Sequence, residues 1–252
     1  MPLFLKKALQ ATGFVLSTSV LGLLSMITGL FWPRGARWFA RAWGKGLCGM
    51  AGFRLRVSGL ENLPRDGGGF VVASNHQSAA DIAVVLAGLP GDVCWVTKAS
   101  LLKVPFIGWH LRMVHIPVSR AKAGNTAKLL QAGAQKIRDG AMVVIFPEGT
   151  RNRAPEHLLP FRKGAFLLAE AAGRPIVPVA ISGSADLMKP GALLPESGVI
   201  DLRIGPPVDP TIFAPGDLEG LAQATRRAVQ ELLGHPPDER FDDQRQVASA
   251  AG

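Results

Sequence analysis

Gly69-Phe70-Val71-Val72-Ala73-Ser74-Asn75-His76-Gln77-Ser78-Ala79-Ala80-Asp81 joins a short, Val-rich apolar run to a longer one, Ile82 to Leu89. The first run predicts a buried strand, and the second predicts a helix that ends at Gly88 and Pro90. His76 then lies in a strand-to-helix turn, where α/β folds form ligand clefts, with Asp81 in the first turn of the helix. Asp81 can accept one ring N–H and leave the other nitrogen basic. Alternatively, the two residues form a helix-capping pair.

The rest of the chain extends this alternation of strands and helices. The 252 residues, 48% of them hydrophobic, suffice for one sizeable α/β core. We therefore predict a mixed, mostly parallel sheet flanked by helices, with Pro117 marking a strand at an edge or a strand end. The other predicted strands are 53–57, 93–97, 113–118, 142–146, 176–181 and 202–204, and the other predicted helices are 125–139, 163–172 and 217–233.

The positive charge is concentrated at the N-terminus. The chain carries a net charge of +9, and residues 1–60 contain eight basic residues and no acidic one, so the remainder carries 28 − 8 = 20 basic and 19 acidic residues. A nucleic-acid-binding face would need clusters of Arg, Lys or aromatic residues on the folded body, which the sequence lacks, so we expect no nucleic acid partner. A basic segment beside an apolar one favours an anionic membrane surface.

An uncharged stretch runs from Ala8 to Pro33, and its apolar part, 14–32, would form a helix about 29 Å long, close to the thickness of a bilayer core. A second helix, 36–50, carries Trp among Arg and Lys, as membrane interfaces do. One transmembrane span, two helices in one leaflet, and a buried helix of a soluble protein all remain open. We predict an N-terminal membrane-associating segment over 1–50, an α/β domain over 51–235 and a polar tail over 236–252.

The sequence predicts no metal centre and no cofactor. The two cysteines, Cys48 and Cys94, lack metal-ligand spacing and indicate a reducing compartment without a disulfide framework. The five histidines form no zinc-binding pattern.

Four polar blocks follow or end predicted buried strands, and strand ends in such a sheet can converge on one cleft. Together they offer His, Asp, Lys, Glu and Arg, a mixture that suits an anionic substrate whose hydroxyl must be deprotonated. The blocks are Asn75 to Asp81; Lys98 through Pro105 and Gly108 to Arg120; Phe146-Pro147-Glu148-Gly149-Thr150-Arg151; and Ile176 to Val179.

In these four blocks, from about Phe53 to Ile204, the chain resembles the membrane-bound glycerolipid acyltransferases, and among them the 1-acyl-glycerol-3-phosphate acyltransferases. The order and rough spacing match the family's HxxxxD, Pro-x-x-Gly with a downstream Arg, Phe-Pro-Glu-Gly-Thr-Arg and Val-Pro blocks. The chain departs from the family at Pro117, where an aromatic residue is frequent, and at Ser100, where an acid is frequent.

The resemblance implies transfer of a fatty acyl group from acyl-CoA or acyl carrier protein to the free hydroxyl of a lysophospholipid, giving phosphatidic acid. His76 would be the general base and Asp81 would orient its ring. No cofactor or metal is needed, because the thioester is already activated. The expected substrate-binding residues are Lys98, Arg120 and Arg151 for the phosphate, Glu148 and Thr150 for the glycerol backbone, Pro178 for the cleft wall, and also Gly108 and Gly149.

Two other functions remain open. One is acylation of another lysolipid, such as a lyso-ornithine lipid that lacks the phosphate, and the other is a non-catalytic protein of the membrane surface. For the enzyme we expect membrane lipids as partners and a catalytic domain on the cytoplasmic face of the membrane.

Overall fold

The computed structural model describes residues 3–98, 102–103, 108, 111, 115–118, 126–189, 192 and 194–236. Within these ranges, seven strands form one sheet in the order β1-β7-β6-β2-β5-β3-β4. The strands are β1 (Phe53–Ser58), β2 (Phe70–Ser74), β3 (Val93–Lys98), β4 (Ile116–Val118), β5 (Met142–Ile145), β6 (Ile176–Ser182) and β7 (Gly198–Ile204). The helices are α1 (Leu3–Phe31), α2 (Pro33–Ala51), α3 (Asp81–Gly88), α5 (Thr126–Arg138), α6 (Gly164–Ala172), α7 (Ser184–Leu187) and α8 (Leu218–Leu233).

The sheet is mixed and mostly parallel, as the sequence predicts. Every neighbouring pair runs parallel except β6 and β7, which run antiparallel. β4, which contains Pro117, is an edge strand, where a residue without an N–H does not interrupt a ladder. The resulting α/β architecture confirms the predicted fold class.

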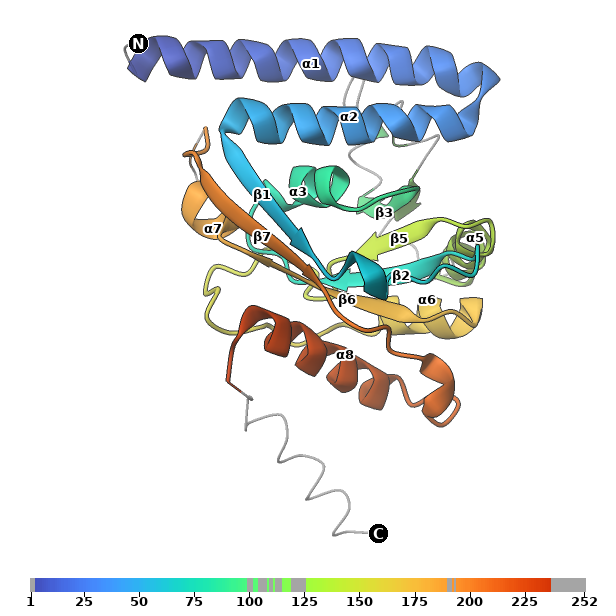
Figure 1. Cartoon of the computed structure of the whole chain (residues 1–252). Helices are drawn as coiled ribbons and strands as arrows, with labels where there is room; N and C mark the ends of the chain where they lie inside the picture. The colour runs from blue at the N-terminus through green and yellow to red at the C-terminus, as the bar shows by residue number, and fades with distance from the viewer. Residues whose placement is uncertain are drawn as a thin grey trace.

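Both faces of the sheet are covered. Successive residues of a strand point to opposite faces, so neighbouring residues belong to different cores. Val72 and Val144 belong to one apolar core with residues of α2 and α3. Val71 and Val143 belong to a second core with residues of α5, α6 and α8. This explains why the central strands are continuously apolar rather than alternating. Figure 1 shows α3 on one side of the sheet and α6 and α8 on the other.

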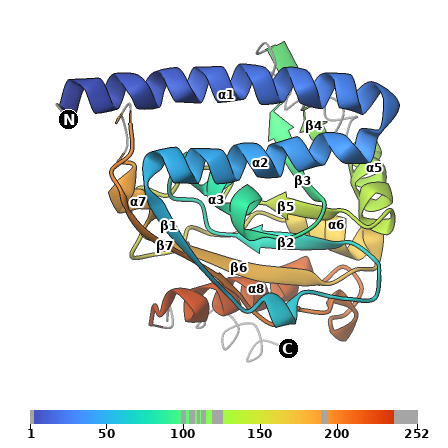
Figure 2. The ribbon, with the colours of Figure 1, turned by 45° about the horizontal axis from the view of Figure 1, so that its top comes forward.

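α1 and α2 form an antiparallel helical hairpin that lies over α3 (Figures 1 and 2). Gln10 Nε2 donates to Met50 O at 3.0 Å, and Trp43 Nε1 donates to Thr18 Oγ1 at 3.0 Å, so the helices are joined at two levels. α2 begins at Pro33, earlier than the predicted start at residue 36, because proline suits the first position of a helix. It ends at Ala51 and is capped by Gly52, whose left-handed φ of 74° suits glycine.

The outer face of α1 exposes apolar side chains. Among the described residues, Lys7–Phe31 is the one helical stretch long and apolar enough to cross a membrane by length and composition, and 11% of its window is buried in the protein. Leu9, Leu16, Leu23 and Leu30 recur every seven residues with 65%, 62%, 41% and 71% of their surface exposed. These four leucines, here called the leucine stripe, are unlike the polar surface that a helix presents to water.

The hairpin is joined to the sheet through close contact between α2 and α3. A Cβ atom added at Gly44 would lie 2.7 Å from Leu86 Cβ and 2.9 Å from the backbone O of Ala83. Arg37 of α2 also forms an ion pair with Asp92, in the loop after α3. α3 therefore packs against α2 on one side and the sheet on the other, and its first residue is Asp81.

We expect Gly44→Ala to destabilise the protein, although alanine normally favours a helix over glycine by about 0.5–1 kcal/mol. The added methyl group would meet the backbone of α3, which cannot move aside as a flexible side chain can. Overpacking of this kind costs about 1–3 kcal/mol. Thermal unfolding in a single detergent would measure the loss as a lower Tm.

Gly46→Ala is the matched control, because Gly46 lies in the same helix and an added Cβ would meet nothing within 4 Å. This variant should have an unchanged or higher Tm. Equal increases for both alanine variants would contradict close packing of α2 on α3 at Gly44.

Candidate active site

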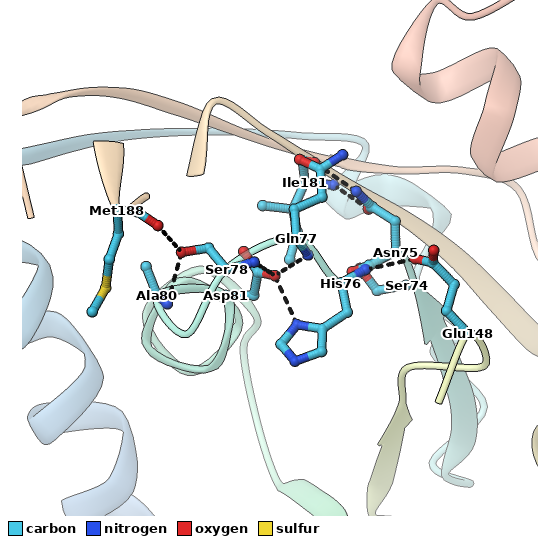
Figure 3. A network of polar contacts seen from close by, with 10 residues as sticks. All are labelled: Ser74, Asn75, His76, Gln77, Ser78, Ala80, Asp81, Glu148, Ile181 and Met188. Atoms are coloured by element: carbon cyan, nitrogen blue, oxygen red, sulfur yellow. Dashed lines mark hydrogen bonds and ion pairs between the residues drawn. The ribbon is translucent and has the colours of Figure 1, made fainter. Parts of the chain in front are cut away.

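The site lies at the carboxyl end of β2, where the chain turns toward α3. Asn75, His76, Gln77, Ser78 and Asp81 form a dense network of polar contacts there (Figure 3). A parallel sheet collects the ends of β2, β5 and β6 at one edge, which is where such folds bind ligands.

The Asp81 carboxylate organises this turn. One of its oxygens, Oδ2, accepts hydrogen bonds from the backbone N–H groups of Gln77 at 2.7 Å and Ser78 at 2.8 Å, and from His76 Nδ1 at 2.8 Å. Asp81 is fully buried, so these contacts are shielded from water. Of the two alternatives, the structure shows ring orientation: Asp81 Oδ2 accepts from residues before α3, and the helix has no side-chain cap at its N-cap residue Ala80. The same oxygen holds the turn and the imidazole.

The contact with Asp81 sets the chemistry of the His76 ring. A carboxylate accepts hydrogen bonds, so Nδ1 carries the proton and the neutral ring has Nε2 as its basic nitrogen. Among the residues that the structure describes, none forms a hydrogen bond with Nε2, which points away from Asp81 (Figure 3). The His76 side chain is 16% exposed. An imidazole held in this way can accept a proton from a bound hydroxyl group.

Asn75 fixes the end of β2 to β6. Its side chain accepts from Ile181 N and donates to Ile181 O, both at 2.8 Å, and it is fully buried. The side chain thus replaces the backbone partners that β2 loses where it leaves the sheet. Sequence reasoning assigned no role to Asn75, although an amide directly after a buried strand was the available signal.

Glu148 joins the turn after β5 to the backbone of His76. Its Oε1 accepts from His76 N at 2.9 Å and its Oε2 from Leu159 N at 3.1 Å. Burial raises the pKa of this carboxyl group, while the two backbone hydrogen bonds act in the opposite direction. With 2% of its surface exposed, Glu148 acts within the protein by bracing His76, and binding of the glycerol backbone stays a prediction.

The segment after this turn is fastened to His76 as well. Asn152 N donates to His76 O at 2.6 Å, and Asn152 Oδ1 accepts from Ala154 N at 3.0 Å. Gln77 Nε2 donates to Pro155 O at 3.5 Å. Both backbone groups of His76 therefore have partners on the chain that follows β5, and the residue is held from two directions.

A positively charged surface adjoins Glu148. Thr150 and Arg151 are exposed on the turn, and Gly149 has a left-handed φ of 70°. A Cβ atom at Gly149 would lie 2.6 Å from Arg162 Nε, so the Arg162 side chain lies directly over this glycine. Within the described part of the chain, neither Arg151 nor Arg162 forms an ion pair. Sequence reasoning missed Arg162, whose available signal was its position directly before the predicted helix over 163–172.

The remaining predicted site residues are either buried in the protein or lie outside the described residues. Pro178 is buried in β6 opposite Ala73 of β2. Its carbonyl O accepts from Gly205 N at 2.9 Å, so the side of the strand that lacks an N–H faces the end of β7 and not β2. Gly108 is buried against the backbone of Leu102, where a Cβ atom would collide. The Lys98 side chain, Pro105 and Arg120 lie outside the described residues.

A family model described as Acyltransferase matches residues 54–182, which contain the His76–Asp81 turn, the Glu148 turn and Pro178. The chain belongs to the acyltransferase family. The match confirms the resemblance seen in the four sequence blocks, and it covers β1 to β6 of the fold.

This acyltransferase is similar in sequence to proteins named 1-acyl-sn-glycerol-3-phosphate acyltransferase. It is 35% identical over 141 residues to a chloroplastic 1-acyl-sn-glycerol-3-phosphate acyltransferase of Brassica napus, a match that covers 56% of this chain and 40% of the relative. It is 34% identical over 205 residues to the 1-acyl-sn-glycerol-3-phosphate acyltransferase of Pseudomonas aeruginosa, covering 80% of this chain and 75% of that protein. The chain thus spans about two fifths of the length of the chloroplastic relatives, at 40% and 39%.

The crystal structure of the 1-acyl-sn-glycerophosphate acyltransferase of Thermotoga maritima superposes with a TM-score of 0.75 at 26% sequence identity. The match covers 93% of this acyltransferase and 98% of the Thermotoga chain. A match of that extent includes the N-terminal helices as well as the sheet.

We expect Glu148→Gln to weaken the site, because an amide presents an NH2 group where one carboxylate oxygen accepts a hydrogen bond. Either His76 N–H or Leu159 N–H would then face a donor. Leaving a buried donor unpaired costs about 1–3 kcal/mol, so the free energy of unfolding should fall by that amount. The exposed Glu156 supplies the control, and Glu156→Gln should leave stability unchanged.

The same variant tests the raised pKa of Glu148. Because the folded protein holds this proton more tightly than the unfolded chain, wild type should gain stability relative to Glu148→Gln as the pH falls from neutral toward the ordinary Glu pKa of about 4.3. Denaturant unfolding of both proteins across this range measures the difference. A difference that stays constant or shrinks at lower pH would contradict a raised pKa.

Proposed function

We propose that this chain transfers a fatty acyl group from a thioester, acyl-CoA or acyl carrier protein, to the free hydroxyl of 1-acyl-glycerol-3-phosphate. The observation that carries the proposal is the 2.8 Å contact between His76 Nδ1 and Asp81 Oδ2, which leaves Nε2 as a base. Glu148, which accepts from His76 N, belongs to the turn that carries Arg151 and lies under Arg162, and neither arginine forms an ion pair in the described part of the chain. The names of the relatives support the same reaction and the same acceptor.

In this reaction His76 Nε2 takes the proton of the acceptor hydroxyl while the hydroxyl oxygen attacks the thioester carbonyl carbon. The carbon–sulfur bond then breaks, and the departing thiolate takes the proton from Nε2. The imidazole is thus neutral before and after each turnover. Asp81 keeps the proton on Nδ1 throughout and stabilises the imidazolium that forms between the two steps, as the aspartate of a hydrolase triad does.

The phosphate of the acceptor is assigned to Arg151 and Arg162, together with Lys98 and Arg120 from the second sequence block. Support comes from the exposure of both described arginines and from Gly149, whose missing Cβ lets the Arg162 guanidinium lie over the turn. Guanidinium groups bind phosphate through two parallel hydrogen bonds. Thr150, exposed on this turn, remains assigned to the glycerol backbone, and Glu148 positions His76.

The hairpin over 1–50 is assigned to the membrane, with the α/β domain on the cytoplasmic face. We infer that α1 lies along the bilayer surface, because it packs on α2 at two levels and α2 is fixed to α3. The leucine stripe then faces the lipid, where a solvent-facing stripe of this size would cost hydrophobic free energy.

Replacing His76 tests the reaction. We expect His76→Ala to abolish acyl transfer, and Asp81→Asn to reduce kcat by at least about 100-fold, since an amide can no longer fix the tautomer. Thioester consumption in the presence of lysophospholipid measures both. The control is binding to anionic vesicles, which both variants should retain because the leucine stripe is unchanged. Near-normal turnover by His76→Ala would remove the base from the proposal.

Replacing the arginines tests the acceptor. Arg151→Ala and Arg162→Ala each remove a charge-assisted contact, and kcat/KM for the phosphate-bearing acceptor should fall by about 10- to 100-fold. The loss should be mainly in KM if the contact is equally strong in the ground and transition states. Lysine should restore activity only in part, because a point charge lacks the bidentate geometry.

A lyso-ornithine lipid, which lacks the phosphate, is the comparison acceptor in the same experiment, and it should be unaffected by either substitution. Arg138→Ala, at the exposed end of α5 and away from the carboxyl ends of the strands, serves as the control for charge removal. Equal losses on both acceptors would refute phosphate binding and favour the lyso-ornithine function.

A further inference from the structure

The His76 ring stacks on the ring of Phe146. Their centroids lie 4.0 Å apart and the ring planes differ by 6°. The hydrogen bond to Asp81 holds one nitrogen, but a ring held at one point can still rock about that contact. The Phe146 face removes this freedom, because tilting of the imidazole would bring it into the phenyl ring.

Phe146 is itself held by the neighbouring strand. It directly follows β5, and the ring of Trp95 in β3 lies 5.3 Å from it at an angle of 39°. Trp95 pairs with Val144 in the parallel ladder between the two strands, and 7% of its surface is exposed. The sheet register therefore sets the separation of the two aromatic rings.

A buried histidine, which the reaction does not use, completes the arrangement. The backbone N–H of Trp95 donates to His115 Nδ1 at 2.9 Å, and His115 is 5% exposed just before β4. A backbone amide can only donate, so Nδ1 of His115 has no proton and the neutral ring carries it on Nε2. His115 is thus held in the opposite tautomer to His76.

We propose that His115, Trp95 and Phe146, here called the ring column, are positioning residues that set the plane of the His76 imidazole. The inference rests on the proposed function, in which His76 Nε2 is the general base. His115 fixes the backbone of Trp95, Trp95 braces Phe146, and Phe146 supports the imidazole face. The ring column aims Nε2 at the acceptor hydroxyl but touches no substrate, so it acts on proton transfer and not on binding.

Steady-state kinetics test the ring column through the difference between kcat and KM. Phe146→Leu should lower kcat by about 10- to 100-fold while KM for the lysophospholipid stays within about twofold, because a misaimed base slows the chemical step alone. Phe146→Tyr keeps the stacking face and should retain most of the activity. His115→Leu removes the acceptor for Trp95 N–H and should lower kcat in the same way, whereas the side-chain oxygen of His115→Asn can replace Nδ1 and restore it in part.

Phe166→Leu is the matched control for loss of a buried ring. Phe166 is fully buried in the core on the other face of the sheet, where it stacks on Phe161 and not on His76. This variant should lower Tm at least as much as Phe146→Leu while kcat per folded enzyme remains that of wild type. A similar fall in kcat for Phe166→Leu would show that the ring column acts only through stability, and would overturn the proposal.

NMR of the detergent-solubilised protein labelled with ¹⁵N-histidine gives a readout that does not depend on turnover. Wild type should show His76 as the Nδ1–H tautomer and His115 as the Nε2–H tautomer, and Phe146→Leu should shift the His76 ring protons by removing the ring current of Phe146. Protonation of His115 at Nδ1, or unchanged His76 signals in Phe146→Leu, would overturn the proposal that the ring column positions His76.

Failure of the ring column is distinguishable from failure of the proposed function. If Phe146→Leu and His115→Leu turn over at the wild-type rate while His76→Ala is inactive, the ring column is wrong and the base assignment stands. If His76→Ala is active, the base assignment is wrong, and the ring-column proposal that rests on it is wrong as well. If His115→Leu does not fold, Phe146→Leu and the wild-type tautomers decide the question.

Discussion

A single carboxylate oxygen, Asp81 Oδ2, accepts three N–H donors within 2.8 Å, and the rest of the site depends on it. Two donors belong to the backbone of the turn and one to the imidazole, so the fold of the turn and the tautomer of His76 have the same cause. Asp81 is fully buried at the start of α3, which shields these contacts from water and strengthens them. The core around α3 therefore contributes directly to the chemistry of His76.

The backbone of His76 is held as firmly as its side chain. Glu148 accepts its N–H and Asn152 donates to its carbonyl oxygen, so the segment after β5 forms a small bridge onto the residue after β2. These contacts join neighbouring strand ends where the ladder between β2 and β5 stops. Both backbone groups of His76 are therefore paired with the segment that follows β5.

Much of this arrangement could be predicted from local sequence. The Val-rich run before His76 and the apolar run after Asp81 correctly predicted β2, α3 and the turn between them. Pro117 predicted a strand at an edge or a strand end, and β4 lies at the edge of the sheet. β7 was predicted only over 202–204, since its residues alternate with polar ones, and it extends from Gly198 to Ile204. Partners far apart in the chain could not be predicted, because they depend on strand order: Asn75 with Ile181, and Trp95 with Phe146.

The contact at Gly44 constrains that position of the hairpin more strongly than the exposed face of α1 is constrained. In the proposed orientation the leucine stripe faces lipid, a fluid neighbour that accommodates many side-chain shapes, so other apolar residues could replace these leucines. Gly44 cannot be replaced as freely, because any side chain at this position would meet the main chain of α3, the helix that carries Asp81. A different helical hairpin grafted onto this domain would need a residue without a Cβ atom at the position of Gly44, because otherwise it would displace α3 and with it the His76–Asp81 turn.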